Sequence, residues 1–277
     1  FSGSRASRRT RINIAIYYML SITEKENPKM SVSNTPNNLD KPLTKDDLGC
    51  LPNYSGFSMM IVGSSGSGKT TLLYSIMTKP KKKKLCQSYK RLFDFIYIIS
   101  PTLGGKSMKN DKFSCIPDDQ IYRELTLEGL TELEEKLYKN REDDLNSIVI
   151  MDDIGSQLRR NQKCEKKLVQ LIQNRRHAFT SYISLVQKFK DYPTGIRNNC
   201  SHLAFFRPKN RMESDSITNE LMPFDNKKNA QLLSFVFDNE KSKFPFMFVD
   251  MSLKHSNRFQ FYNGFNPLTI TDEQPLK

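Results

Sequence analysis

The residues best suited to chemistry form the stretch Gly63-Ser64-Ser65-Gly66-Ser67-Gly68-Lys69-Thr70. It matches the phosphate-loop pattern G-x-x-x-x-G-K-[ST], between the apolar run 57–62 and a helix-like segment 71–77. Glycines let backbone N–H groups close around a phosphate, and a helix N-terminus adds partial positive charge. In such a loop Lys69 reaches the β- and γ-phosphates, and the Thr70 hydroxyl binds Mg²⁺. The residues predicted to hold a nucleotide are Gly63, Ser64, Ser65, Gly66, Ser67, Gly68, Lys69, Thr70 and Thr71.

Two adjacent carboxylates, Asp152 and Asp153, follow the apolar run 147–151. Nucleotide hydrolysis needs one acid to hold Mg²⁺, usually through water, and a second can polarise the attacking water. We expect Asp152 to organise the metal with Thr70, and Asp153 to activate the water. Two adjacent acids at the end of a strand suit both tasks, although their side chains start out on opposite faces of the strand.

A polar residue, Gln187, ends the next apolar run, 181–186. Its amide is placed to hydrogen-bond the γ-phosphate or the attacking water. In the order loop, apolar run, Asp-Asp, apolar run and Gln, this residue is predicted to be a nucleotide sensor.

A GTPase must be weighed, because Asp152-Asp153-Ile154-Gly155 also satisfies the pattern D-x-x-G. Guanine is read by N-K-x-D or a close variant. The nearest candidate, Gln187-Lys188-Phe189-Lys190, lacks the aspartate that pairs with the base. An extra apolar run, 93–100, also lies between Lys69 and Asp152, as in ATPases that insert a strand there. ATP is therefore the predicted nucleotide.

Composition points to a basic protein with a reducing environment. The chain has 277 residues, of which 37% are hydrophobic. Its formal net charge is +13, which favours an anionic partner such as nucleic acid. Its five cysteines are scattered without C-x-x-C spacing, which argues against a disulfide framework and a zinc site. The apolar run 12–20 is shorter than the roughly 18 residues of a membrane span, so no membrane partner is expected.

The first residues of the chain are polar and basic. The chain begins at Phe1, and Met30 is our favoured start of translation, with Met19 as the alternative. Residues 1–46 are expected to be a disordered or partly non-native tail, because residues 21–47 hold few large apolar groups.

The densest basic stretch is a candidate for contacts with DNA phosphates, and the alternatives are a nuclear-import-like tract or a solvated loop. It consists of Lys79, Lys81, Lys82, Lys83, Lys84, Lys90 and Arg91.

Alternating strand and helix patterns predict an α/β protein. Strands are expected at 57–62, 93–100, 147–151, 181–186, 201–206 and 245–251. Helical patterns include Leu130, Leu133 and Leu137, and the segment 165–175. The predicted fold is a P-loop NTPase of the RecA-like (ASCE) type, with a mostly parallel sheet flanked by helices. We expect the ATPase domain over residues 47–255, and a C-terminal extension of irregular edge structure over 256–277.

The sequence resembles the FtsK–HerA superfamily of DNA-pumping ATPases, and in particular the genome-packaging ATPases of poxviruses, large DNA viruses and virophages. The resemblance covers roughly residues 55–222. The segments that carry it are 60–63 leading into Gly68-Lys69-Thr70, 97–102, 148–153, Asn174-Arg175-Arg176-His177, 185–187 and 195–199. Asp153 departs from the pattern, because cellular members usually have Glu there, which leaves its role as base less secure than the metal role of Asp152.

The resemblance implies an oligomeric ring, with a hexamer favoured, that threads double-stranded DNA into a capsid in the virion or host cytoplasm. Such rings complete each site with an arginine from the neighbouring subunit, worth roughly 10³ to 10⁵ in rate. Arg197 is the first candidate for this role. The other arginines considered are Arg175, Arg176, Arg207 and Arg211.

Two alternatives stay open: a DNA helicase or conjugation-type ATPase, and a nucleotide-gated protein that binds DNA or capsid without sustained turnover.

A second group of basic residues follows the Asp152-Asp153 pair and is a candidate for contacts with DNA in the pore of the ring. It consists of Arg159, Arg160, Lys163, Lys166 and Lys167.

Overall fold

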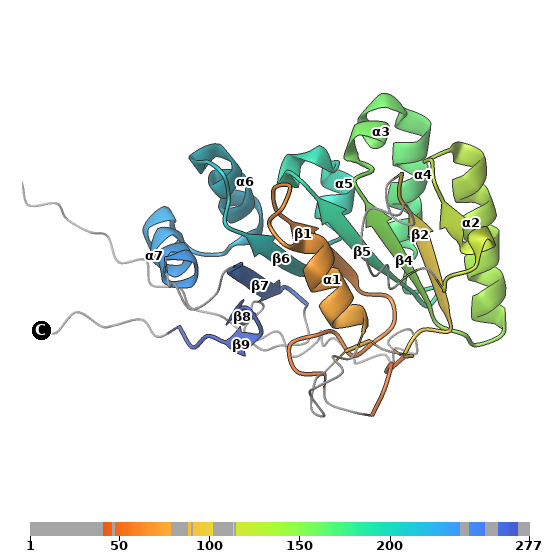
Figure 1. Ribbon diagram of the computed structural model, residues 1–277, viewed down its shortest axis with the longest axis horizontal. Coiled ribbons are helices and arrows are strands. Elements are labelled where there is room, and N and C mark those ends of the chain that lie inside the picture. The colour runs from red at the N-terminus through yellow and green to blue at the C-terminus, as the bar shows by residue number, and fades with distance from the viewer. Residues whose placement is uncertain are drawn as a thin grey trace, which may run out of the picture. The chain divides into compact units, whose positions relative to one another are not determined.

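A nine-stranded sheet forms the centre of the protein in the computed structural model, with strand order β3-β2-β4-β5-β1-β6-β7-β8-β9 (Figure 1). The structure describes residues 41–45, 48–78, 88–89, 91–101, 113, 115–238, 244–252 and 260–270. The strands are β1 (Ser58–Val62), β2 (Phe95–Ile99), β3 (Ile121–Tyr122), β4 (Ser147–Asp152), β5 (Thr180–Val186), β6 (His202–Phe206), β7 (Phe246–Asp250), β8 (Gln260–Asn263) and β9 (Asn266–Pro267).

The strands from β3 to β6 in this order pair in parallel, whereas β7, β8 and β9 pair antiparallel. In the parallel part, all carboxyl ends lie at one edge, which we call the carboxyl edge. The opposite edge, where these strands begin, is the amino edge. Ligands of open α/β sheets bind outside the carboxyl ends of the strands, so the carboxyl edge is where a site is expected.

Both faces of the sheet are buried, because its central strands are continuous apolar runs. Every residue of β1 and β5 is buried. Side chains alternate between two cores: Met60 and Val62 join one, Met59 and Ile61 the other. This is the pattern of strands covered by helices on both sides.

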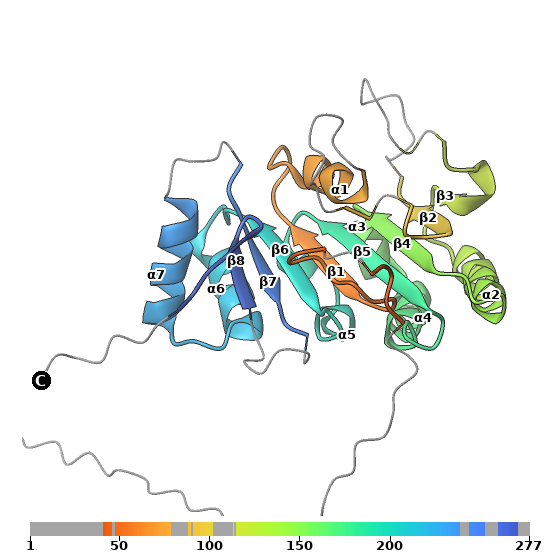
Figure 2. The same ribbon diagram turned by 90° about the horizontal axis from the view of Figure 1, so that it is seen from below.

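The helices cover the two faces unequally. Helix α1 (Lys69–Met77) covers one face, and α2, α4, α5 and α6 lie on the other (Figure 2). Their bounds are α2 (Leu127–Glu142), α3 (Gly155–Arg160), α4 (Gln162–Gln173), α5 (Thr194–Arg197), α6 (Arg211–Leu221) and α7 (Asn226–Phe237), with short 3₁₀ helices η1 (Asp118–Gln120) and η2 (Phe189–Asp191). Side-chain caps from Thr126, Asn161, Asn210 and Asp225 begin α2, α4, α6 and α7.

The predicted fold class is confirmed, and the six predicted strands agree with β1, β2, β4, β5, β6 and β7 within two residues at each end. One expectation was wrong: residues 260–267 do not form irregular edge structure but the strands β8 and β9, which extend the same sheet. These strands are short and polar in part. Pairing with the buried β7 defines β8, and pairing with β8 defines β9.

Some predictions lie outside the described residues: the tail up to residue 40, Met30, and the lysine-rich stretch 79–84 with Lys90. All described residues belong to one unit, Asn37–Lys277. No helix in the described part of the chain is long and apolar enough to cross a bilayer.

Candidate nucleotide site

The phosphate loop connects the buried β1 to α1 at the carboxyl edge. It is anchored where the Gly63 N–H donates to the carbonyl of Val186 at the end of β5 (3.0 Å). Gly66 and Gly68 adopt φ angles of 76° and 108°, which side chains disfavour. At Gly63 space is limiting, since a Cβ there would come within 2.5 Å of the Ser67 hydroxyl oxygen. The loop conformation therefore requires the glycines of the motif.

The side chain of Lys69 folds back over this loop. Its Nζ donates to the carbonyls of Gly63 (2.7 Å) and Ser64 (3.1 Å). Burial lowers the pKa of Lys69, and the negative charges of Asp152 and Asp153 only partly offset this. The ammonium group thus lies among carbonyl oxygens that a phosphate oxygen could replace as its partners.

The loop and the first turn of α1 have the features of an anion cradle. The hydroxyl oxygen of Ser67 is buried and has no hydrogen-bond partner among the described residues. Helix α1 begins without a side-chain cap and without an acidic residue in its first turn, where Thr70 and Thr71 lie. Its first N–H groups are therefore available to phosphate oxygens, and the residues present fit a nucleotide's phosphate chain.

The two carboxylates end β4 in different environments. Asp152 is half-buried, whereas Asp153 is exposed and has a φ of 55°. That left-handed backbone turns Asp153 out of the strand, while its N–H still donates to the carbonyl of Leu185 (3.4 Å). The two carboxylates therefore differ in exposure, and Asp153 lies just beyond the last residue of β4.

Gln187 reaches Asp153 from the neighbouring strand. Its Nε2 donates to Oδ2 of Asp153 at 3.0 Å. The structure therefore brings together two predicted site residues that are far apart in sequence. The side-chain amide of Gln187 thus donates a hydrogen bond to the carboxylate of Asp153, which is predicted to activate water.

The remaining predicted ligands fit a magnesium ion rather than a metal held by protein alone. No group of three or more His, Cys, Asp or Glu in the described ranges could hold a metal. Mg²⁺ usually takes one or two protein oxygens and keeps phosphate and water oxygens as its other ligands. A hydroxyl on Thr70 and a carboxylate on Asp152 match that need.

Comparison with known proteins identifies the family. The model of the poxvirus A32 protein family matches residues 51–261, which include the phosphate loop, both carboxylates and Gln187. The chain belongs to the poxvirus A32 protein family.

Relatives of this A32 family chain are viral packaging proteins. DNA packaging protein OPG160 of vaccinia virus (strain Copenhagen) is 28% identical over 168 residues, 60% of this chain and 57% of that protein. The monkeypox virus protein of the same name is 28% identical over 60% of this chain and 52% of its own length. The chain thus spans somewhat more than half the length of these relatives.

Two solved structures share the fold. The crystal structure of B204, the DNA-packaging ATPase of Sulfolobus turreted icosahedral virus, has a TM-score of 0.53 at 16% identity, covering 76% of this chain and 98% of B204. The structure of the genome packaging NTPase B204 from Sulfolobus turreted icosahedral virus 2, in complex with ATP-gammaS, has a TM-score of 0.51 at 14% identity. The match covers 75% of this chain and 97% of that B204 chain. These likenesses show the packaging-NTPase fold for the A32 family chain.

Arg197, the first candidate for the inter-subunit arginine, is held within its own chain. It is 9% exposed, pairs with Glu220 through two hydrogen bonds (2.7 and 3.0 Å), and donates to the Tyr192 carbonyl. Its guanidinium also lies 5.1 Å from the centre of the Phe189 ring. A residue that completes a neighbour's site must extend outward, so this geometry disfavours Arg197 and favours a role in fixing α5 to α6.

The runner-up arginines lie at different edges. Arg175 precedes β5 at the amino edge, where it donates to the carbonyls of Gly56 and Ile172 (both 2.9 Å), and Arg176 is next to it. Arg207 and Arg211 follow β6 at the carboxyl edge. Both are exposed, although Arg207 pairs with Asp238 (2.9 Å) and Arg211 is 3.6 Å from Asp215. The latter pair has the exposure and the edge that an inter-subunit contact requires.

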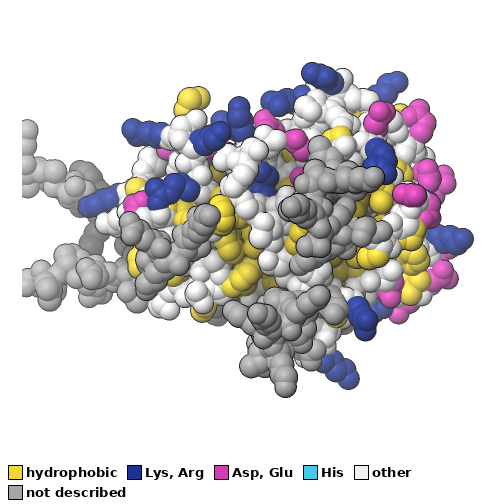
Figure 3. Space-filling model, viewed as in Figure 1, with side chains coloured by type: hydrophobic (Ala, Val, Ile, Leu, Met, Phe, Trp, Pro, Cys, Tyr) yellow, Lys and Arg dark blue, Asp and Glu magenta, His cyan; other side chains and the backbone are white. Residues whose placement is uncertain are grey.

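Basic side chains gather at the carboxyl edge near α3. Arg159, Arg160, Lys163 and Lys166 are exposed, whereas Lys167 is half-buried and bound to Glu134 (2.5 Å). Figure 3 shows Lys and Arg along the upper edge, and Asp and Glu gathered on the right, where Figure 1 labels α2. Lys167 therefore belongs to the packing of α4 on α2, and the other four residues form an exposed basic surface.

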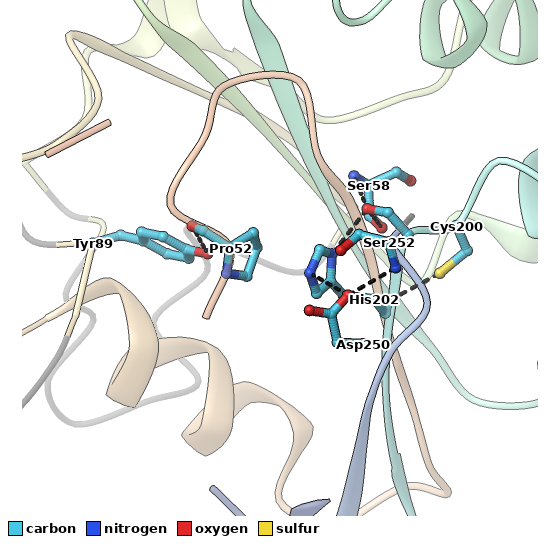
Figure 4. A network of polar contacts seen from close by, with 8 residues as sticks. Pro52, Ser58, Tyr89, Cys200, His202, Asp250 and Ser252 are labelled. Carbon is cyan, nitrogen blue, oxygen red and sulfur yellow. Dashed lines mark hydrogen bonds and ion pairs between the residues drawn. The ribbon is translucent and has the colours of Figure 1, made fainter. Parts of the chain in front are cut away.

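A buried polar cluster occupies the amino edge at the start of β6 (Figure 4). His202 is fully buried, and its Nε2 lies 3.2 Å from Oδ1 of Asp250. Burial raises the pKa of Asp250, but His202 and the Ser252 N–H (2.8 Å) outweigh it and hold the pKa below its usual range. The Ser201 hydroxyl links Nδ1 of His202 (2.9 Å) to the backbone of β1. This cluster joins the ends of β1, β6 and β7 through polar contacts at the amino edge.

Sequence reasoning did not single out Phe206, the last residue of β6. Its ring packs on both Gly63 and Gly68 of the phosphate loop, 3.0 and 3.4 Å from where their Cβ atoms would lie. An aromatic residue at the end of an apolar run looks like any core residue. Only the placement of β6 beside β1 brings it to the loop.

Proposed function

We propose that this chain is an ATP-hydrolysing, Mg²⁺-dependent motor that moves double-stranded DNA during genome packaging, as an oligomeric ring with a hexamer favoured. The observation that carries the proposal is the convergence of three features at one edge: the phosphate loop after β1, Asp152-Asp153 at the end of β4, and Gln187 after β5. Each supplies a separate requirement of phosphoryl transfer, namely phosphate binding, metal binding and orientation of the nucleophile.

The protein's own residues would divide this chemistry as follows. Loop N–H groups and Lys69 would hold the phosphates, and Thr70 with Asp152 would hold Mg²⁺, which when bound neutralises developing charge. Asp153 would accept a proton from the attacking water, kept in orientation by Gln187. A general base of this kind contributes typically 10²- to 10⁴-fold in rate.

DNA is the polymer partner that the surface supports. The chain carries a net charge of +13, and Arg159, Arg160, Lys163 and Lys166 are exposed beside the candidate site. Contacts of lysine and arginine with phosphates are independent of sequence, which suits a motor that must pass any genome. The relatives from vaccinia and monkeypox viruses are named DNA packaging proteins.

The ring requires a residue that reaches the neighbouring site, and we propose Arg207 or Arg211 for it, with Arg197 disfavoured by its internal contacts. Capsid proteins are the proposed second partner. The proposed location is the virion or the host cytoplasm. Cys50, Cys115, Cys164 and Cys200 are free thiols, consistent with a reducing compartment.

The first experiment measures ATP turnover by the full chain with and without long double-stranded DNA, and with GTP in place of ATP. We expect DNA-stimulated, ATP-selective turnover that Lys69→Ala abolishes and that Lys139→Ala, a change at an exposed lysine of α2, leaves intact. Turnover indifferent to DNA or favouring GTP would contradict the proposal.

A second measurement separates the alternatives. Strand separation and a preference for single-stranded DNA would indicate a helicase or conjugation-type enzyme instead. If Asp153→Asn kept packaging activity in infected cells while turnover was lost, a nucleotide-gated assembly protein would be the better description.

A further inference from the structure

Beside the phosphate loop lies a cluster of aromatic side chains from the C-terminal part of the sheet. Phe206, at the end of β6, contacts Gly63 and Gly68. Its ring centre is 5.7 Å from that of Phe246, which is 5.2 Å from that of Phe265. Phe244 is adjacent, with its Cβ 3.7 Å from where a Cβ of Gly68 would lie. We call these four residues the aromatic platform.

The platform is formed by pairing between distant segments. Phe206 and Phe246 face each other across the antiparallel β6–β7 pair, and the β8–β9 turn brings Phe265 alongside them. Gly264 has a φ of 60° at this turn, and its N–H donates to the Phe246 carbonyl (2.8 Å), which fixes the turn against β7. Figure 2 shows the start of β7 approaching the loop that precedes α1.

The outer members of the platform are only partly covered. Phe244 is 47% exposed and Phe265 is 44% exposed, whereas Phe206 beneath them is 5% exposed. Large aromatic rings left half-exposed next to a binding loop are a usual sign of a ligand surface. Each of these rings offers an apolar face that carries no charge.

The position of the platform relative to the catalytic groups defines what could cover it. The strand order is β4-β5-β1-β6-β7, so Asp152, Asp153 and Gln187 lie on one side of the phosphate loop. The platform lies on the other side, on the face of the sheet that α1 covers. A nucleotide whose γ-phosphate meets the carboxylates extends its base away from them, toward β6 and β7.

We propose that the aromatic platform binds the purine base of the nucleotide, with Phe244 and Phe265 as the stacking surface and Phe206 as its support on the loop. The proposal rests on nucleotide binding at the phosphate loop. Aromatic stacking holds a base without hydrogen-bond readout, so the platform adds affinity for nucleosides more than choice between purines. It also gives β8 and β9 a role in the site.

The test uses the absence of tryptophan from the chain. Phe265→Trp introduces a single tryptophan at the platform, which can be excited at wavelengths where the eleven tyrosines do not absorb. Phe235→Trp introduces one at an exposed position of α7 as a matched control. ATPγS is expected to quench emission of Phe265→Trp, and inorganic tripolyphosphate is expected to leave it unchanged while competing with ATPγS. Neither ligand is expected to affect Phe235→Trp.

Calorimetry with alanine variants gives the energetic counterpart. Phe244→Ala and Phe265→Ala should each weaken ATPγS binding by about tenfold and leave tripolyphosphate binding unchanged, since one stacked ring contributes roughly that much. Phe235→Ala should bind both ligands like the natural chain. Lys69→Ala should weaken both ligands.

The outcomes separate two failures. Unchanged ATPγS affinity in both platform variants, with silent fluorescence, would overturn the platform proposal while leaving the phosphate site intact. If Lys69→Ala bound both ligands as tightly as the natural chain does, the proposal that the phosphate loop binds the nucleotide would be wrong. If the platform variants altered only subunit association in sedimentation experiments, the surface would be an interface between copies, and the base-binding proposal would be wrong.

Discussion

The carboxyl and amino edges of the sheet both hold charged and polar groups, but they use them in opposite ways. At the amino edge, His202 and Asp250 are buried and face each other, and Arg175 donates to two carbonyls of its own chain. At the carboxyl edge, Asp153 and Gln187 are exposed, and the Ser67 hydroxyl has no partner among the described residues. Polar groups paired internally stabilise a fold, whereas groups held ready at a strand end serve a ligand.

The comparison also explains the arginines. Arg197 is paired inside its own chain, as the polar groups of the amino edge are. Its guanidinium contacts Glu220, the carbonyl of Tyr192 and the ring of Phe189. Arg159 has the opposite character, with a side chain that is 62% exposed and a single ion pair to Asp191 at 3.2 Å. Variants at the two edges should therefore divide into those that change activity and those that change stability.

The largest effect is expected for Asp153→Asn at the carboxyl edge. Removing the proposed base while keeping the side chain's size should lower turnover about 10²- to 10⁴-fold. Binding of ATPγS and the melting temperature should stay close to those of the natural chain. Steady-state turnover and calorimetry check this, with Asp143→Asn on the exposed end of α2 as control. A large loss of stability would mean that the Gln187 contact serves the fold.

At the amino edge, Asp250→Asn is expected to cost about 3 kcal/mol of unfolding free energy, because it leaves buried His202 without its charged partner. The pKa of Asp250 lies below its ordinary value of 3.8, so its ionised form stabilises the fold above that pH. This stabilisation should begin to fall as the pH drops below about 4, and the variant should lack that part of the pH dependence. Urea unfolding between pH 7 and pH 3 measures both.

Arg197→Gln should behave like an amino-edge variant and destabilise the protein by about 2 kcal/mol, because Glu220 loses both of its hydrogen bonds. Turnover per folded, assembled subunit should remain. Denaturant unfolding and turnover of the same sample give the two numbers. Full stability with abolished turnover would restore Arg197 as the inter-subunit arginine. Arg207→Gln and Arg211→Gln are the matched variants for the two residues that we propose instead.

The smallest effect on stability is expected for Arg159→Gln, because an exposed ion pair contributes about 1 kcal/mol or less. Its effect on DNA should be separable. If Arg159 contacts a phosphate, affinity should fall equally for all sequences, and the slope of log K against log salt should decrease by about 1. Binding titrations at several salt concentrations check this, with Arg141→Gln on α2 as control. An unchanged salt slope would exclude Arg159 from the DNA surface.

The phosphate loop and the strands could be predicted because their signals are local. Residues 63–70 form one continuous motif. The strands β1, β4 and β5 are apolar runs that can be recognised in the sequence without information about the strands beside them. The strands β8 and β9 could not be predicted, since they hold only four and two residues. They gain strand structure only because β8 pairs with β7 and β9 pairs with β8. Helix α3 is equally short and was not expected.

Site residues divide along the same line. Asp153 and Gln187 were each predicted from the end of an apolar run, but their 3.0 Å contact follows from the adjacency of β4 and β5. The choice of Arg197 came from resemblance, and burial disfavoured it, because sequence does not say which arginines find a partner inside the chain. Phe206, Phe244 and Phe265 carried no signal at all, as isolated phenylalanines are more often core residues.

By itself, the sequence determined that this protein has a phosphate loop, two carboxylates and an amide at the ends of strands in a mostly parallel sheet, and that it is basic. These follow from residue types over short spans, where chemistry and backbone preference act directly. The tertiary structure alone decided which edge each charge occupies, which arginines are exposed, and that aromatic residues from the last strands meet the phosphate loop. Such contacts join residues far apart in the chain, and burial and strand order, which no local pattern encodes, govern them.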